Sequence, residues 1–164
     1  MIDRPVWLLD VDGVINVRRP GWGAARDGTA HSAGVTYRLR WAPALIERIC
    51  AVHRAGVDIR WCTTWCADAD QLERLFGLPR LDRAWSVELG RAAAAAAKLA
   101  AARQVLAGGR RLIWTDDAEV PTRGAVHDEL TGAGRALLIA PSRRRGLRPE
   151  HLAAIEAFAA VLRA

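Results

Sequence analysis

Two acidic side chains follow the first apolar segment of the chain and could take part in chemistry. The segment Val6–Asp10 ends in one aspartate, and Asp12 comes two residues later, just before Gly13. A short apolar run of this kind is typical of a buried strand of a parallel sheet. Carboxylates are rarely buried without a partner, because losing their hydration is costly. We therefore expect the carboxyl end of this strand to open into a site, as in other open α/β sheets.

Two later segments place further polar side chains at the ends of predicted strands. Thr63 and Thr64 follow one of them, and Asp116 and Asp117 follow another. Because all strands of a parallel sheet end at the same edge, we expect these residues to meet the first aspartate pair. Four crowded carboxylates repel one another unless a cation or shared protons relieve the charge. Oxygen ligands of this kind suit Mg²⁺, and adjacent hydroxyls and an ammonium would suit a phosphate.

The basic composition of the chain has an unusual source. Lysine and arginine together number 24, giving a net charge of +6, yet Lys98 is the single lysine. Abundant alanine and arginine are typical of a GC-rich genome, so part of the charge reflects codon bias. Because this chain otherwise uses arginine as its cation, we expect Lys98 where a compact ammonium is required.

Strands and helices alternate along the chain. The predicted strands are 6–10, 57–62, 84–87, 111–115 and 136–140, and the predicted helices are 43–55, 68–76, 91–106 and one from Pro149 with Leu152, Ile155, Phe158 and Leu162 on one face. This order requires right-handed crossovers and a sheet covered on both faces. The prediction is therefore a single α/β domain, residues 1–164, with a three-layer Rossmann-like fold and a parallel five-stranded sheet.

A glycine-rich segment, about residues 14–41, interrupts this alternation. It contains two β-like runs, Val14–Val17 and Val35–Arg40, separated by a polar link. We expect a short β-hairpin flap that forms a minimal cap, because the segment is too short for a second domain.

Four motifs in order resemble those of the haloacid dehalogenase-like (HAD) phosphohydrolases. Asp10–Val14 resembles motif I, Thr63 motif II, Lys98 motif III, and Asp116–Asp117 the double-aspartate form of motif IV. Finer features resemble the small bacterial HAD domains described with "Swiss Army Knife" RNA-repair proteins, namely Asn16 and the stretches 61–65, 113–117 and 146–152.

The resemblance implies a phosphatase, a phosphoric monoester hydrolase that forms an aspartyl-phosphate. Asp10 would be the nucleophile, and Asp12 would protonate the leaving group and then activate water. The Asp10 carboxylate and the Asp12 backbone carbonyl would bind Mg²⁺, with Asp117 preferred over Asp116 as the further acidic ligand.

The remaining motif residues would bind the phosphoryl group. This role falls to Thr63, Thr64, Lys98 and Gly13 on the strength of the resemblance. Lys98 lies well inside an alanine-rich helical pattern, whereas the family lysine often lies near a helix start. Either the helix begins later than predicted, or the lysine reaches the site from mid-helix.

Several alternatives stay open. Thr63 and Thr64 could simply end a strand, and Lys98 could be an ordinary surface lysine. The run 143–145 could attract a polyanion or be a solvated charge run. Trp22 and Trp65 could stack on a base, although packing is favoured for Trp65. The residues 127–129 could be ligands, although a surface loop is the favoured interpretation.

Substrate and partners are defined only as classes. The expected partner is a phosphorylated small molecule, a nucleotide or a nucleic-acid end, and a homodimer could close a site with so little cap. The alternative is a nucleic-acid-binding or RNA-repair accessory module with the same fold and little turnover. The sequence shows no signal peptide and no apolar span, so we expect a cytoplasmic protein. Its three cysteines are then expected to be reduced thiols: Cys50, Cys62 and Cys66.

Overall fold

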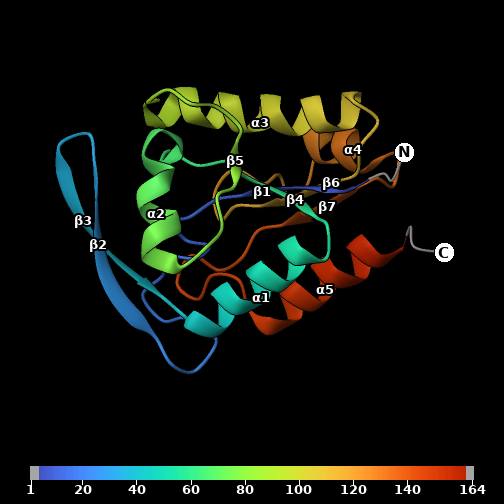
Figure 1. Cartoon of the computed structure of the whole chain (residues 1–164). Coiled ribbons are helices and arrows are strands. Elements are labelled where there is room, and N and C mark those ends of the chain that lie inside the picture. Colours follow the sequence, from blue (N-terminus) through green and yellow to red (C-terminus); the bar gives the residue numbers. More distant parts are fainter. Residues whose placement is uncertain (1–3, 162–164) are drawn as a thin grey trace.

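A computed structural model describes residues 4–161 and shows three layers, with a sheet between two groups of helices (Figure 1). All neighbouring strands of the five-stranded sheet are parallel, in the order β5–β4–β1–β6–β7. The strands are β1 Val6–Leu9, β4 Asp58–Trp61, β5 Asp82–Arg83, β6 Leu112–Thr115 and β7 Ala136–Ile139. The predicted sheet is confirmed, but the predicted strand 84–87 was wrong, because pairing with β4 involves the two preceding residues.

Helices cover both faces of the sheet, as predicted. α1 and α5 lie on one face, and α3 and α4 lie on the other (Figure 1). The helices are α1 Pro43–Arg54, α2 Ala69–Phe76, α3 Arg91–Ala107, α4 Ala125–Thr131 and α5 Pro149–Ala160, with a 3₁₀ turn at Cys66–Asp68. The expected surface loop at 127–129 was wrong: these residues lie in α4, where Leu130 is buried against the sheet.

The last helix follows the predicted pattern. Leu152 and Ile155 are buried, Phe158 packs against the same core, and Leu162 lies outside the described residues. Among residues 4–161, no helix has the length and apolar character needed to cross a membrane.

The alternation of side chains along the central strand decides which layer each residue enters. Trp7 and Leu9 belong to the core beneath α1 and α5, whereas Val6 and Leu8 belong to the core beneath α3 and α4. Because side chains alternate with a period of two, the next even-numbered residue, Asp10, continues toward α3.

The strand order creates a switch point beside β1. The chain adds β4 and β5 on one side of β1 and then crosses through α3 to add β6 and β7 on the other. Ligands of open α/β sheets bind outside the carboxyl ends of the strands at such a point. Here the two strands that flank it, β1 and β6, are those followed by aspartates.

The hairpin consists of β2 (Arg26–Ser32) and β3 (Val35–Trp41), paired antiparallel and lying beside α2 (Figure 1). Its two-residue turn, Ala33–Gly34, has positive φ at both positions (49° and 75°), as turns that match the strand twist require. The side-chain amide of Gln71 in α2 bonds the backbone N–H and carbonyl of His31. The predicted flap is thus confirmed within residues 14–41.

The prediction that Val14–Val17 forms the first strand of the flap was wrong. Residues 14–17 do not form a strand but a tight turn directly after β1, in which the N–H groups of Ile15 and Asn16 bond the carbonyl oxygen of Val11. Their apolar side chains are buried in the core instead of pairing in a hairpin.

Candidate active site

Three aspartates meet at the carboxyl edge of the sheet. Carboxylate oxygens of Asp10, Asp116 and Asp117 all lie within 4.8 Å of one another. Asp10 and Asp116 are almost fully buried, 5% and 0% exposed, because each continues the side of its strand that faces α3. Buried carboxylates at this separation require positive charge nearby.

Lys98 supplies part of that charge from the middle of α3. Its Nζ lies 3.0 Å from Asp10 Oδ2 and 2.6 Å from Asp116 Oδ2. The buried residues one turn to either side of Lys98 are small, Ala94 and Ala102, and leave room for the lysine side chain beside the sheet. The helix begins at Arg91, so the lysine does reach the site from mid-helix.

The electrostatic balance of the cluster is negative. Three ionised carboxylates against one buried ammonium leave two negative charges. Burial and then the neighbouring Asp116 raise the pKa of Asp10 to about 8, although Lys98 opposes this rise. Burial alone would lower the pKa of Lys98, but the carboxylates of Asp10 and Asp116 raise it above its ordinary value. The lysine therefore stays protonated, and Asp10 retains a proton unless more positive charge is present.

The two adjacent aspartates after β6 have different bonds. Asp116 Oδ1 accepts hydrogen bonds from the backbone N–H groups of Ala118 and Glu119, and Asp116 Oδ2 accepts from Lys98. Asp117 Oδ2 lies 3.6 Å from Nε of the exposed Arg143. Burial and then the charge of Asp116 raise the pKa of Asp117 as well, against the effect of Arg143. Asp117 thus has oxygens more available to a cation than Asp116 has.

Gly13 lets the turn after β1 approach the Asp117 carboxylate. Its φ is +75°, and a Cβ atom at this position would lie 2.3 Å from Asp117 Cγ and 2.4 Å from Asp117 Oδ2. A side chain here would force the carboxylate to move. The absence of a side chain at Gly13 therefore leaves room for the Asp117 carboxylate. This role is separate from the phosphate binding that the sequence predicts for Gly13.

Asp12 is not among the three clustered carboxylates. It is exposed, and two side chains hold it: Asn16 Nδ2 donates to Oδ1 at 2.7 Å, and Trp65 Nε1 donates to Oδ2 at 2.9 Å. The sequence alone did not predict that Asn16 and Trp65 would donate hydrogen bonds to Asp12. The spacing of four residues from Asp12 to Asn16, and the tryptophan two residues after Thr63, are the signals that could have suggested it.

The two threonines lie where β4 leaves the sheet beside β1. Leu9 is opposite Trp61 in the parallel register, so the following turn lies next to Asp10. Thr63 is fully buried and its Oγ1 accepts a long bond, 3.4 Å, from the backbone N–H of Trp65, whereas Thr64 is exposed.

A basic loop lines the same edge. The run 143–145 is exposed, and the turn after it packs on the segment that follows β1, through bonds from Leu147 N to the Val14 carbonyl and from Arg19 N to the Arg144 carbonyl. Trp22 Nε1 bonds the Leu147 carbonyl at 2.7 Å, and Arg48 lies over its ring. Trp22 therefore fastens this loop, while the exposed arginines, including Arg18 and Arg19, form a basic rim.

The cysteines and the residues 127–129 do not belong to the aspartate cluster. The three cysteines are free thiols, and burial raises the pKa of Cys62 and of Cys66. His127 contacts its neighbour Asp128, and Glu129 pairs with Arg103 of α3.

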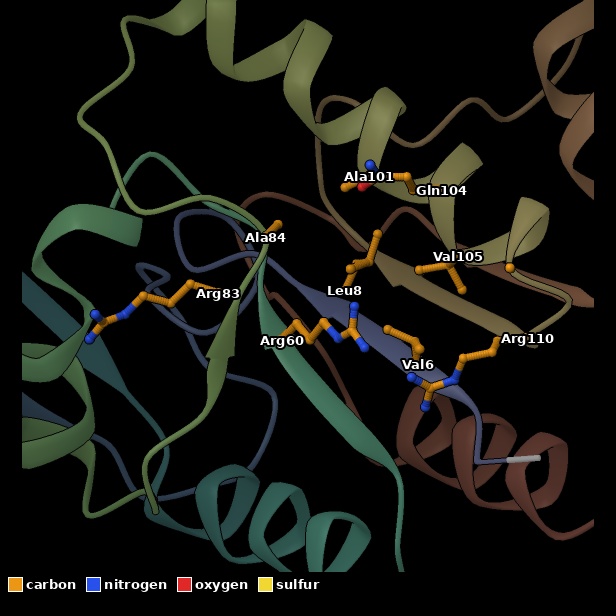
Figure 2. A pocket seen from close by; sticks show the side chains of 10 residues that line it. Val6, Leu8, Arg60, Arg83, Ala84, Ala101, Gln104, Val105 and Arg110 are labelled. Carbon is orange, nitrogen blue, oxygen red and sulfur yellow. The ribbon is translucent and has the colours of Figure 1, made fainter. Parts of the chain in front are cut away.

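A separate cavity of about 250 Å³ lies between α3 and the sheet (Figure 2). Figure 2 shows Arg60 and Arg110 directed toward one another, with Arg83 directed away. The first two both bond the Asp58 carboxylate, so their charge is partly neutralised. Among the described residues that line this cavity, none belongs to the aspartate cluster.

Comparison with known proteins leaves the chemistry to be inferred from this geometry. No protein-family model matches the chain, and no curated protein matches it as a relative.

Proposed function

We propose that the protein is a Mg²⁺-dependent phosphohydrolase of the HAD type, acting on a phosphomonoester through an aspartyl-phosphate on Asp10. One observation carries the proposal: Asp10 lies at the switch point of the sheet, bonded to the chain's only lysine and clustered with two further aspartates. A structural ion pair would not need a third buried carboxylate, because each surplus charge costs solvation energy.

The donor set fits a divalent cation. It consists of carboxylate oxygens, as Mg²⁺ prefers, and it carries a surplus of two negative charges once Asp10 has lost its proton. Asp10 and Asp117 would hold the ion, with the Asp12 backbone carbonyl as the motif implies, and Asp116 would mainly hold Lys98. When bound, the ion would neutralise charge on the phosphoryl oxygens and on Asp10.

The chain's own residues then divide the chemistry. The Asp10 carboxylate attacks phosphorus, the bond from phosphorus to the leaving oxygen breaks, and the Asp12 carboxyl gives that oxygen its proton. Asp12 next takes a proton from water, the resulting hydroxide attacks phosphorus, and the bond to Asp10 breaks to release phosphate. Lys98 holds the Asp10 carboxylate in place, and Thr63 and Thr64 offer hydroxyls to the phosphoryl oxygens.

The substrate class we propose is a nucleotide or nucleic-acid end, where the phosphate is exposed. The hairpin is the only cap-like element among residues 4–161, so the site suits large substrates. The basic rim would bind additional phosphates by charge and release counterions in doing so.

The direct test is release of inorganic phosphate from an aryl phosphate, with and without Mg²⁺. We expect turnover that requires the cation and falls at least about 1,000-fold in Asp10→Asn. Arg103→Met removes an exposed cation of α3 that pairs with Glu129 and not with the cluster, and it should leave turnover unchanged. Activity that survives Asp10→Asn would contradict the nucleophile assignment.

The basic rim also favours a second candidate, a nucleic-acid-binding module with little turnover. A panel of 3′- and 5′-phosphorylated oligonucleotides beside phosphorylated metabolites separates the two. Under the proposal, Arg144→Ser with Arg145→Ser, which leaves the Arg143–Asp117 pair in place, raises KM for the oligonucleotide several-fold and leaves aryl phosphate turnover unchanged. Salt-sensitive oligonucleotide binding without any phosphate release would favour the module.

A further inference from the structure

The contacts of Asp12 differ from those expected of an exposed carboxylate. Water can satisfy an exposed acid, yet this one accepts two short bonds, from Asn16 Nδ2 at 2.7 Å and from Trp65 Nε1 at 2.9 Å. Each oxygen has its own donor, so the plane and direction of the carboxylate are fixed. Holding an exposed side chain in one orientation costs conformational entropy, which argues for a role beyond packing.

Both donors are themselves fastened to the hairpin. The backbone N–H of Arg40 in β3 bonds Asn16 Oδ1 at 2.9 Å. The ring of Tyr37, also in β3, packs edge-on against the indole of Trp65, with ring centroids 5.3 Å apart and an interplanar angle of 75°. Trp65 is only 4% exposed, so its ring cannot turn away without losing this packing.

The hairpin is in turn fixed to the body of the molecule. His31 exchanges two hydrogen bonds with the Gln71 side chain, and Ser32 Oγ donates to Asp68 Oδ2 at 2.7 Å. The path from α2 through the hairpin to the Asp12 carboxylate is therefore continuous.

We propose that Trp65 and Asn16 are positioning residues that hold the Asp12 carboxyl for proton transfer to the leaving group, with the hairpin supporting both. This inference rests on the proposed function. In the first step Asp10 bonds to phosphorus, the bond from phosphorus to the leaving oxygen breaks, and the proton of Asp12 passes to that oxygen. A misplaced acid harms this step only when the leaving group needs the proton.

The test compares kcat/KM for an alkyl and an aryl phosphomonoester. This constant covers events up to cleavage of the bond to the leaving group, so the later water step does not affect it. An aryl oxide leaves readily without a proton, whereas an alkoxide does not. Trp65→Phe, which keeps a ring against Tyr37 but removes the N–H, should lower kcat/KM about tenfold or more for the alkyl substrate and by less than about threefold for the aryl one.

A second variant tests the same role in case Trp65→Phe disturbs folding. Asn16→Asp keeps the oxygen that accepts from Arg40 but replaces the donor to Asp12 with a carboxylate oxygen, and it should show the same selective loss. Trp22→Phe is the matched control: it removes an indole N–H that bonds a backbone carbonyl and should leave the ratio of the two constants unchanged.

A spectroscopic readout is independent of turnover. The indole N–H signal of Trp65, assigned by its loss in Trp65→Phe, should move markedly in Asp12→Asn while the other indole signals stay in place. Equal losses on both substrates, or an unmoved indole signal, would overturn the positioning role. A different result would overturn the proposed function itself. In that case the wild type turns over neither substrate, although Asp12→Asn still moves the indole signal of Trp65, and the contact has no catalytic role.

Discussion

Gly13 controls how closely the turn after β1 approaches Asp117. We expect Gly13→Ala to weaken Mg²⁺ binding about tenfold or more, because the new methyl group would displace the carboxylate. Gly23→Ala is the matched control, since Gly23 also has positive φ (+82°) but has no atom within 4 Å of the Cβ position. Both variants share backbone strain of about 1 kcal/mol. Calorimetric titration with Mg²⁺ measures the difference, and equal affinities in the two variants would contradict the role of Gly13.

Asp10 is expected to reduce stability in the absence of a cation. Its folded-state pKa is raised to about 8, so the folded protein retains a proton that the unfolded chain loses near pH 4. Stability therefore falls as pH rises between these values, and Asp10→Asn removes this penalty. We expect the variant to be more stable than wild type by about 1 to 3 kcal/mol at pH 8, with little difference at pH 4. Thermal unfolding in EDTA measures this, and a less stable variant at pH 8 would refute it.

At the scale of single elements, α3 brings the ammonium of Lys98 to the carboxyl edge of the sheet. Lys98 donates hydrogen bonds to two buried carboxyl groups and offsets part of their charge, so Lys98→Met should destabilise the protein by about 3 to 5 kcal/mol in urea unfolding. Lys98→Arg keeps the charge, but a planar guanidinium does not fit where the Nζ lies 2.6 and 3.0 Å from two carboxylates. Both variants should lose about 100-fold or more in phosphate release. Turnover near the wild-type rate in Lys98→Arg would show that only charge matters.

The elements that sequence predicted best are those with a strong period. Alternation along β1 and β6 places Asp10 and Asp116 on the α3 side, and the helical spacing of Ala94, Lys98 and Ala102 directs the lysine toward them. Local pattern was enough to expect Asp10 and Asp116 at this edge of the sheet. Lys98 was expected there because it is the single lysine and resembles motif III, since the alanines around it mark no face of the helix.

Other elements depend on contacts that a local pattern does not contain. Val14–Val17 has the composition of a strand, yet burial and bonds to Val11 fold it into a turn. The true first strand of the hairpin carries Gly28, whose missing side chain makes room for Trp41 and Leu75. For the same reason the bond from Trp65 to Asp12 was missed, since it joins residues 53 positions apart.

At the scale of the whole molecule, the α/β architecture could be predicted because strands and helices alternate throughout the chain. The switch point follows from the order β5–β4–β1–β6–β7, which brings the aspartates of β1 and β6 together. The substrate could not be predicted in this way, because it depends on the rim of the site and not on the sheet that supports it.

A charge cluster away from the three aspartates supports this architecture. Asp58 in β4 bonds Arg60 and also Arg110, which itself bonds the Arg4 carbonyl. Burial alone would raise the pKa of Asp58, but the two arginines hold it below its ordinary value. The resulting stability is present above about pH 4 and is lost as pH falls through the folded pKa.

Asp58→Asn should therefore destabilise the protein by about 1 to 2 kcal/mol at pH 7, and the difference from wild type should shrink below pH 4. Asp70→Asn is the matched control, because its pair with Arg74 is exposed and should contribute less than about 0.5 kcal/mol. Urea unfolding across this pH range measures both variants, and a difference for Asp58→Asn that is independent of pH would contradict the assignment.

The most direct test of the central claim is covalent trapping of the phosphoryl group. Protein mixed with a radiolabelled aryl phosphate and Mg²⁺ is quenched in acid, and its peptides are analysed for the label. We expect the label on Asp10 in the wild type, more of it in Asp12→Asn, where water is no longer activated, and none in Asp10→Asn. Label on another residue, or phosphate release without any labelled protein, would contradict Asp10 as the nucleophile.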